Sequence, residues 1–450
     1  MMIPPLFEAR IRNTFAPEEA EEFLHSLGRV PAVSVRRHPV KGAGVFAGLP
    51  QVPWHPQGVY LPERPEFILD PALHAGAYYV QESSSMFLKK AMEKTELPAQ
   101  AMVLDLCAAP GGKSTLLLSH LPPDALLVAN EVIRTRIPAL KENIQRWGDA
   151  RAMVTNADPA DFETLEEAFD CILVDAPCSG EGMFRKDSAA AGHWSPEALQ
   201  TCGLRQERIL KSAAGALKTG GYLIYSTCTF NPGENEAQVA RLLREGFEYV
   251  PILDDPEWPE IARIPGGGYA FYPHRVQGEG FFLALLQKTG SSYGEAKETR
   301  LRKPYFEKTL KPDAGMDRWL EDPAAFARKE RNGIAYIVPQ ALEKNMEWVA
   351  SAVQVMYAGI AAGASKGGEF LPEHALALST AAKADIPHIE FTEEEALRFL
   401  KKESNRSHDV PKGIYAVRHN GLNLGWVKAV PGRLNNLLPM EFRIRKNIDG

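Results

Sequence analysis

The chain has 450 residues, more than the roughly 250 to 300 at which a single hydrophobic core stops growing, so two or three domains are expected. Its hydrophobic content of 45% and charged content of 24% are typical of a globular protein, and its longest apolar runs are far too short to cross a bilayer. Five cysteines without a CxxC pair argue against a disulfide framework and against a zinc site, so no metal is expected. With no signal peptide visible, we expect a cytoplasmic protein with reduced thiols. The net charge of -6 is uneven: Lys401 to Gly450 hold ten Lys and Arg against four Asp and Glu, a basic module on an acidic body.

The first 70 residues contain one helical pattern and one basic stretch. The helical pattern is PEEAEEFLHSL (Pro17–Leu27), and the basic stretch is SVRRHPVKG (Ser34–Gly42). A proline-rich region follows as far as Pro71. A solvated face remains the ordinary explanation of such a charge cluster.

From about Ala101, apolar strand patterns alternate with helical patterns. The predicted strands are MVLDLCA, LLVANEV, RAMVTNA, CILVDAP, GYLIYST and EGFFLALLQK, the last ending at Lys288. The helical patterns between them include KSTLLLSHL and the segment beginning at Ser195 and Pro196, which form a favourable cap and first turn. This alternation predicts a parallel sheet flanked by helices. Lys297–Gly315 is predicted to be a linker, and the patterns beyond it are weaker.

The first strand leads into VLDLCAAPGGKSTLL (Val103–Leu117). A glycine-rich turn between a first strand and a helix is where α/β folds bind nucleotide-like ligands. Gly112, Lys113 and Ser114 fit a Walker A loop, but Cys107 stands where its first glycine is required, and the dinucleotide pattern GxGxxG is absent. A phosphate-binding nucleotide hydrolase is therefore the second hypothesis.

Acidic residues follow the next strands at their ends. Glu131 follows LLVAN, Asp158 follows MVTNA, and Asp175 lies in LVDAP. A carboxylate after the second strand suits the hydroxyls of a ribose, and one after the third can accept from an adenine amino group. Together they predict a site for an adenosine-containing ligand that needs no phosphate.

Cys228 falls at the carboxyl end of the strand GYLIYST, just before a turn. Ligands bind at that edge of open α/β sheets, whereas free cysteine is also often a small buried hydrophobe. Position alone leaves both interpretations open.

Five motifs together resemble one enzyme family. CAAPGGK (Cys107–Lys113), NEV, Asp158, DAPCSGEGMFRKD (Asp175–Asp187) and YSTCTFNPGENE (Tyr225–Glu236) are similar to the motif series of the Sun-like RNA 5-methylcytosine methyltransferases, and within them to the bacterial enzymes that methylate 16S ribosomal RNA. The resemblance spans about Ala77 to Lys288. It implies an α/β, Rossmann-like core that depends on S-adenosylmethionine. Gly421–Arg443 resembles the family's carboxyl-terminal module, related to the PUA type of RNA-binding barrel.

The resemblance also implies a role for each site residue. The cofactor S-adenosyl-L-methionine is held by the loop Cys107, Ala108, Ala109, Pro110, Gly111, Gly112 and Lys113, with Glu131 on its ribose and Asp158 on its adenine. Asp175 lies beside cofactor and base. Carbon 5 of cytosine is a weak nucleophile, so Cys228 attacks carbon 6 and Cys178 assists release.

Domains and partners follow from the same resemblance. We expect an N-terminal RNA-binding domain at 1–75, a methyltransferase domain at 76–290, and a C-terminal region at 300–450 that ends in the PUA-like module from about residue 385. The expected partner is ribosomal RNA of the small subunit or an assembly intermediate, bound by a monomer, with no membrane and no DNA. Methylation of another RNA such as tRNA, and a non-catalytic RNA-binding factor, are the alternatives. The basic tail and the stretch Ser34–Gly42 are expected to position the RNA, with backbone contacts from Arg185 and Lys186. Lys113 could neutralise either the carboxylate of the cofactor or an RNA phosphate. Phe184 and Tyr225 could stack on the base, although core packing is the favoured role for each.

Overall fold

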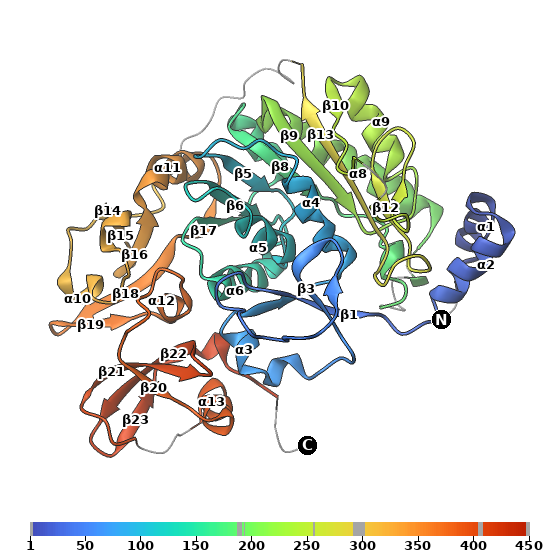
Figure 1. Cartoon of the computed structure of the whole chain (residues 1–450). Coiled ribbons are helices and arrows are strands. Elements are labelled where there is room, and N and C mark those ends of the chain that lie inside the picture. The colour runs from blue at the N-terminus through green and yellow to red at the C-terminus, as the bar shows by residue number, and fades with distance from the viewer. Residues whose placement is uncertain are drawn as a thin grey trace.

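A ten-stranded sheet forms the centre of the molecule, and three smaller sheets surround it (Figure 1). The computed structural model describes residues 3–186, 191–192, 194–254, 257–290, 302–403 and 408–446. Among these residues, no helix has the length and apolar character needed to cross a membrane.

Five parallel strands make up the middle of the central sheet. They are β5 (Met102–Asp105), β6 (Leu126–Asn130), β7 (Ala152–Thr155), β8 (Phe169–Asp175) and β9 (Leu217–Thr227). Their order is β7-β6-β5-β8-β9. Antiparallel strands continue the sheet beyond β9, namely β13 (Phe281–Lys288), β12 (Tyr269–Phe271), β11 (Ala262–Arg263) and β10 (Phe247–Tyr249).

All six strands predicted from the apolar patterns are confirmed. The last of them, β13, runs antiparallel to β9, whereas the alternation of strands and helices predicted a parallel sheet. An apolar run shows that a strand is buried but not its direction, which depends on the connection that precedes it.

Helices cover both faces of the central sheet. One face packs against α4 (Leu88–Met92), α5 (Gly112–Leu118) and α6 (Ile137–Trp147). The other packs against α8 (Pro196–Ala216), α9 (Glu236–Arg244) and α11 (Glu343–Ala352). Neighbouring strand residues such as Val103 and Leu104 belong to opposite faces, as the period-2 geometry of a strand requires. The predicted cap of α8 is confirmed, because Ser195 Oγ accepts a hydrogen bond from the Ala198 amide at 3.1 Å.

The N-terminal region has two parts. A helical hairpin, α1 (Pro5–Thr14) and α2 (Pro17–Ser26), comes first. A four-stranded sheet follows, in the order β2-β3-β1-β4 and formed by β1 (Val33–Arg37), β2 (Gln51–Val52), β3 (His55–Leu61) and β4 (Tyr78–Val80), with α3 (Pro71–His74) before the last strand. Because β4 completes this sheet, the sheet continues past residue 75; a domain boundary there remains a prediction.

Two cations of the basic stretch Ser34–Gly42 make internal hydrogen bonds, Arg36 fully buried and Lys41 partly buried, which corrects the expectation that this stretch contacts RNA with all its cations. Arg36 donates hydrogen bonds to Gln81 Oε1 at 2.7 Å and Thr115 Oγ1 at 2.7 Å, and burial lowers its pKa to about 9. Lys41 Nζ donates to the carbonyl oxygens of Arg146 and Leu378. These hydrogen bonds connect the N-terminal region to α5, α6 and α12 (His374–Leu378).

The C-terminal region contributes a strand to the central sheet. Its own five-stranded sheet consists of β14 (Lys308–Thr309), β15 (Phe326–Arg331), β16 (Ile334–Pro339), β18 (Ile360–Lys366) and β19 (Glu369–Pro372), with α10 (Ala314–Asp317) and α12 (His374–Leu378) beside it. Strand β17 (Val355–Ala358) instead pairs antiparallel with β7, as Val355 faces Thr155. The final module has its own apolar core and consists of β20 (His388–Glu390), α13 (Glu393–Leu400), β21 (Gly413–His419), β22 (Leu422–Val430) and β23 (Arg433–Asn436).

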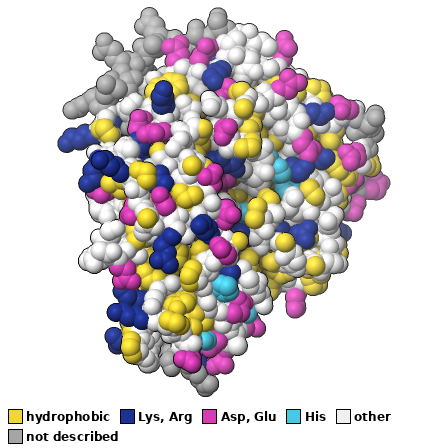
Figure 2. Space-filling view, turned by 60° about the vertical axis from the view of Figure 1, so that its left-hand side comes forward, with side chains coloured by type: hydrophobic (Ala, Val, Ile, Leu, Met, Phe, Trp, Pro, Cys, Tyr) yellow, Lys and Arg dark blue, Asp and Glu magenta, His cyan; other side chains and the backbone are white. Residues whose placement is uncertain are grey.

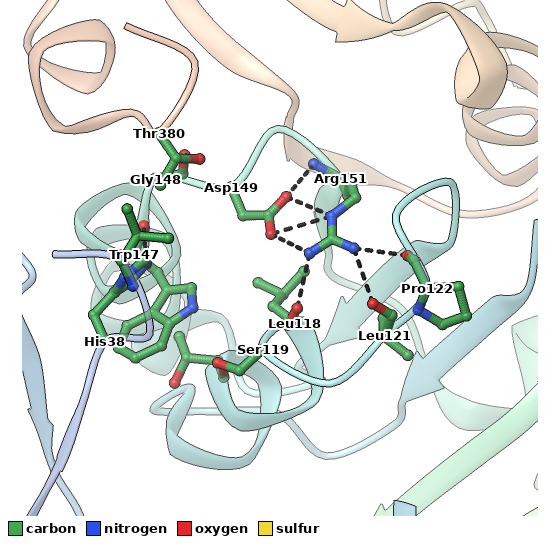
Figure 3. Close-up of polar contacts among 12 residues, drawn as sticks. His38, Leu118, Ser119, Leu121, Pro122, Trp147, Gly148, Asp149, Arg151 and Thr380 are labelled. Atoms are coloured by element: carbon green, nitrogen blue, oxygen red, sulfur yellow. Dashed lines mark hydrogen bonds and ion pairs between the residues drawn. The ribbon is translucent and has the colours of Figure 1, made fainter. Parts of the chain in front are cut away.

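All three regions meet at the carboxyl end of α6 (Figure 3). His38 Nε2 donates to the carbonyl of Trp147 at 3.2 Å, and the Thr380 amide donates to the carbonyl of Gly148 at 3.0 Å. Arg151 pairs with Asp149 and also donates to the carbonyls of Leu118, Leu121 and Pro122, which neutralises the end of α5. These contacts border a cavity of about 570 Å³.

Candidate active site

The direction in which strands are added reverses between β5 and β8. Strand β6 lies beyond β5 and strand β9 lies beyond β8, so the loops after β5 and β8 diverge at the carboxyl edge of the sheet. Such a switch point is where open α/β sheets bind ligands. The predicted loop Cys107–Lys113 follows β5, Asp175 ends β8, and Cys228 follows β9. The structure thus brings the predicted site residues to one edge.

The glycine-rich loop Cys107–Lys113 is hydrogen-bonded to the end of β6 and to α6. The Ala108 amide donates to the Asn130 carbonyl at 2.8 Å, and Asn143 Nδ2 donates to the Pro110 carbonyl at 2.9 Å. Gly111 caps α5 with φ of 111°, in the region that favours glycine. The free amides of the first turn of α5 are therefore available at the ligand edge.

The two acids after β6 and β7, Glu131 and Asp158, differ in their exposure to solvent. Glu131 is buried, accepts from the Ile133 amide at 2.8 Å, and pairs with Arg136 at 3.0 Å. The Asp158 side chain is 40% exposed and lies 3.0 Å from Arg208. It also accepts from the Ala160 amide at 3.0 Å. Each carboxylate thus has one amide donor and one arginine as partners, and Asp158 is the more exposed of the two.

Asp175 and Lys113 form an ion pair between the loop and β8. Lys113 Nζ lies 2.8 Å from Asp175 Oδ2, and Ser226 Oγ donates to Asp175 Oδ1 at 2.8 Å. Burial disfavours the charged lysine, but the Asp175 carboxylate outweighs this and raises the pKa of Lys113. Lys113 therefore remains a fixed positive charge beside the thiols, paired to Asp175 rather than free for an RNA phosphate.

The two predicted catalytic cysteines are in contact. Their sulfur atoms lie 3.2 Å apart, and both are free thiols. A hydrogen bond from the Cys178 thiol lowers the pKa of Cys228, and the Lys113 charge acts in the same direction. The same hydrogen bond, together with burial, raises the pKa of Cys178. Either sulfur can donate across this contact, so the distance itself does not assign their roles; the lowered pKa of Cys228 means that the thiolate, the nucleophilic form, is the more favoured there.

Three polar residues that contact the predicted site or its loops were not predicted. Asp105, buried at the end of β5, accepts from Ser114 Oγ at 2.6 Å, and burial raises its pKa to about 7. Glu234 accepts from the amide and hydroxyl of Ser179, and Ser226 holds Asp175. Asp105 could have been found, because it ends the strand MVLD in the same way as the other strand-end acids. The partners of Glu234 and Ser226 lie about 50 residues away, and no local pattern indicates them.

Several secondary expectations have clear outcomes. Phe184 and Tyr225 are buried in the apolar cores, which confirms the packing interpretation for both. Arg185 is also buried and pairs with Glu279 at 2.9 Å, so it does not contact the RNA backbone as expected. Burial raises the pKa of the Cys107 thiol well above its ordinary value, which fits a packing role.

Solved structures identify the class of protein that this fold represents. A methyltransferase homolog from Pyrococcus horikoshii is 26% identical and matches with a TM-score of 0.53, covering 63% of this chain and 94% of that protein. The ligand edge described above is thus the edge of a methyltransferase-type α/β sheet.

Sequence comparisons are more specific. The family described as 16S rRNA methyltransferase RsmB/F matches residues 94–287, the RsmF N-terminal domain matches 3–83, and the RsmF PUA domain matches 386–444. Ribosomal RNA small subunit methyltransferase F from Aliivibrio salmonicida is 34% identical over 98% of both chains. That of Pectobacterium atrosepticum is 40% identical over 60% of this chain and 59% of its own. The chain belongs to the RsmB/F family of 16S rRNA methyltransferases, which confirms the predicted family, the methyltransferase core and the PUA module.

Proposed function

We propose that this protein methylates carbon 5 of cytosine in 16S ribosomal RNA with S-adenosylmethionine, as a cytoplasmic monomer. The observation that carries the proposal is the thiol pair: Cys228 Sγ lies 3.2 Å from Cys178 Sγ, beside Lys113, at the ligand edge of a methyltransferase-type sheet. Family membership supports the ribosomal substrate.

The residues at this edge suit the cofactor. Free amides at the start of α5 and the Glu131 carboxylate match the amino-acid and ribose parts of S-adenosylmethionine, and Asp158 lies where an adenine would follow. When bound there, S-adenosylmethionine supplies an electrophilic methyl group.

The two cysteines carry out the covalent chemistry. The Cys228 thiolate adds to carbon 6 of the cytosine, and the displaced electron pair makes carbon 5 nucleophilic enough to accept the methyl group. The proton on carbon 5 then passes to the sulfur of Cys178, acting as a thiolate, and the electron pair of the broken C–H bond restores the ring double bond and expels the Cys228 thiolate. Cys178, in contact with Cys228, assists this release, and Asp175 faces the amino and ring-nitrogen edge of the base. The target base must be unpaired or flipped out to reach these groups.

The proposal has a direct experimental test. Purified 16S ribosomal RNA and the assembled small subunit are each incubated with protein and S-adenosylmethionine, and 5-methylcytosine is mapped. We expect cofactor-dependent methylation of cytosine in at least one of the two. Methylation of tRNA alone, or binding of RNA without methylation, would support one of the alternative functions instead.

Replacing Glu131 by alanine is expected to weaken S-adenosylmethionine binding by about 1 to 3 kcal/mol, the usual cost of losing a hydrogen bond to a charged group. Asp158→Ala should act in the same direction. Asp124→Ala is the matched control, because Asp124 is exposed and precedes β6 at the opposite edge of the sheet. Calorimetric titration measures each affinity. Saturable binding of ATP together with no binding of S-adenosylmethionine would contradict this assignment.

The cations of the basic C-terminal module differ in whether they are paired. Figure 2 shows Lys and Arg side chains interspersed with Asp and Glu over the face of the whole molecule that it presents. Two cations of the module are paired with distant acids: Lys428 with Glu369, and Lys446 with Glu66. Lys412, Arg433 and Arg445 are exposed.

Charge reversal of Lys412, Arg433 and Arg445 should therefore weaken RNA binding and flatten its salt dependence. Removing one cation that neutralises a phosphate reduces the slope of log K against log salt by about 0.7 for single-stranded RNA. Reversal is preferable to deleting residues 401–450, because that deletion removes β21 to β23 and their buried core. The control is Arg244→Glu, exposed at the end of α9. An unchanged slope in the triple variant would show that these cations are only a solvated surface.

A further inference from the structure

The loops that carry the two cysteines hold each other through reciprocal contacts. Glu234, in the loop after β9, accepts from the Ser179 amide at 2.9 Å and from its hydroxyl at 2.6 Å. Glu181, in the loop after β8, accepts from the Phe230 amide at 3.1 Å. Each carboxylate therefore fixes a residue that lies one or two positions after the other loop's cysteine. The spacing of the two sulfur atoms depends on both.

The backbones of these loops are also in direct contact. The Gly182 amide donates to the Cys228 carbonyl at 2.9 Å. A Cβ on Gly182 would lie 2.9 Å from that oxygen and 2.6 Å from the Gly280 carbonyl, so only glycine fits. A small displacement of the segment around Glu181 is thus transmitted to Cys228.

The two carboxylates are stabilised differently. Glu234 is surrounded by neutral donors, including Gln206 Nε2 at 3.0 Å, and burial raises its pKa. Glu181 is completely buried and also accepts from Trp194 Nε1 at 2.7 Å. In the described part of the chain, the cation paired with Glu181 is Arg10 of helix α1, at 2.6 Å.

The helical hairpin that carries Arg10 packs on the same loops. Phe7 lies 5.1 Å from Phe184 between ring centroids, and Phe23 lies 5.0 Å from Phe230. Figure 1 shows α1 and α2 in dark blue at the edge of the molecule, on the side of β12. The hairpin is therefore in contact with the segments that follow both cysteines, through α1 on the side of Cys178 and through α2 on the side of Cys228.

We propose that Arg10 is a positioning residue for the thiol pair: the α1–α2 hairpin supplies the charge that keeps Glu181 seated between the catalytic loops, so the N-terminal helices take part in methyl transfer. The inference rests on the proposed function. A buried carboxylate deprived of its cation is strongly destabilised, and the relief is movement of the loop or penetration of water. Misplacement of a reacting group by about 1 Å can cost about 100-fold in rate.

The test compares Arg10→Met with Arg12→Met. Arg12 lies on the same helix but pairs with Glu8 and Glu21 at the surface, so it is the matched control. For Arg10→Met we expect kcat for RNA methylation to fall about 10- to 100-fold, with KM for RNA and S-adenosylmethionine binding within about twofold of wild type. Arg12→Met should match wild type. The alkylation rate of Cys228 by iodoacetamide, followed by peptide mass spectrometry, should fall only in Arg10→Met.

A second variant separates positioning from general instability. Glu181→Gln in the Arg10→Met background keeps an acceptor for the Phe230 amide but removes the uncompensated charge, so it should recover much of the lost kcat. If Arg10→Met does not fold, Arg10→Lys, which keeps the charge with fewer donors, and the double variant provide the comparison with Arg12→Met. A normal kcat and normal Cys228 reactivity in Arg10→Met, or no recovery in the double variant, would overturn the inference. A rise in KM for RNA alone would make the hairpin an RNA contact instead.

The outcome is distinguishable from failure of the proposed function. If the wild-type protein methylates no RNA, the proposed function fails, while Cys228 alkylation in Arg10→Met against Arg12→Met still decides whether Arg10 positions the thiol.

Discussion

Cys228→Ala is expected to abolish methyl transfer and to form no covalent complex with RNA. Without its sulfur, nothing adds to carbon 6, and carbon 5 remains too weak a nucleophile. Cys178→Ala should behave differently, because attack and transfer remain possible while release is blocked. With S-adenosylmethionine present, this variant should accumulate a protein–RNA adduct that survives denaturing electrophoresis. The double variant should lose the adduct.

Because the contact between the sulfur atoms lowers the pKa of Cys228, we also expect the rate of adduct formation by Cys178→Ala to depend on pH. Cys178→Ala removes the thiol that donates to Cys228, so the pKa of Cys228 should rise. Less thiolate is then present at neutral pH, and adduct formation by Cys178→Ala should speed up as the pH increases. An adduct kept by Cys228→Ala but lost by Cys178→Ala would reverse the two roles. If either residue were only a core residue, its loss would alter stability by the cost of a small cavity and leave adduct chemistry intact.

Lys113→Met is expected to have the second largest effect, a loss of methyl transfer of about 10- to 100-fold at neutral pH. Lys113 lowers the pKa of Cys228, while Asp175 acts in the opposite direction. Removing the cation leaves Asp175 unpaired beside the sulfur, so the pKa of Cys228 rises, and each unit of rise reduces the thiolate fraction about tenfold.

The measurement is the pH dependence of Cys228 alkylation in the protein without RNA. The Lys113→Met profile should move to higher pH, and Lys113→Arg, which keeps the charge, should stay close to wild type. Because Lys113 lies in the predicted cofactor loop, S-adenosylmethionine binding is measured in parallel. An unshifted profile together with weaker cofactor binding would assign Lys113 to the cofactor alone.

The sequence predicted the central sheet and the location of its ligand edge. Strands β5 to β9 each contain an apolar run, and Glu131, Asp158, Asp175 and Cys228 each stand at or just after a strand end, the edge where open α/β sheets bind ligands. These features depend on neighbours in sequence. Predicted roles for individual residues at this edge remain proposals until variants are tested.

The features that the sequence did not predict depend on distant partners. Arg36 belongs to a basic run typical of a solvated surface, yet Thr115 and Gln81 enclose it. Glu181 and Glu234 lie within recognised motifs, but their carboxylates accept hydrogen bonds from a loop about 50 residues away in the sequence. No local pattern indicates these contacts. Strand β17 has four residues, and its partner β7 lies about 200 residues earlier in the sequence. No local sequence pattern therefore predicts that β17 joins the central sheet.

The pairing of β17 with β7 also constrains how this chain is made. Thr155 and Val355 face each other, and a ribosome that adds about 5 to 20 residues per second needs about 10 to 40 seconds to cover the interval between them. During that time the strands β8, β9 and β13 are added to the sheet, while its β7 edge still offers unpaired amides and carbonyls to any other strand. A fragment that ends at residue 290 would keep that edge open permanently. Expression of the methyltransferase part alone should therefore yield a protein that aggregates more readily, because the short strand β17 of the C-terminal region then no longer pairs with the β7 edge.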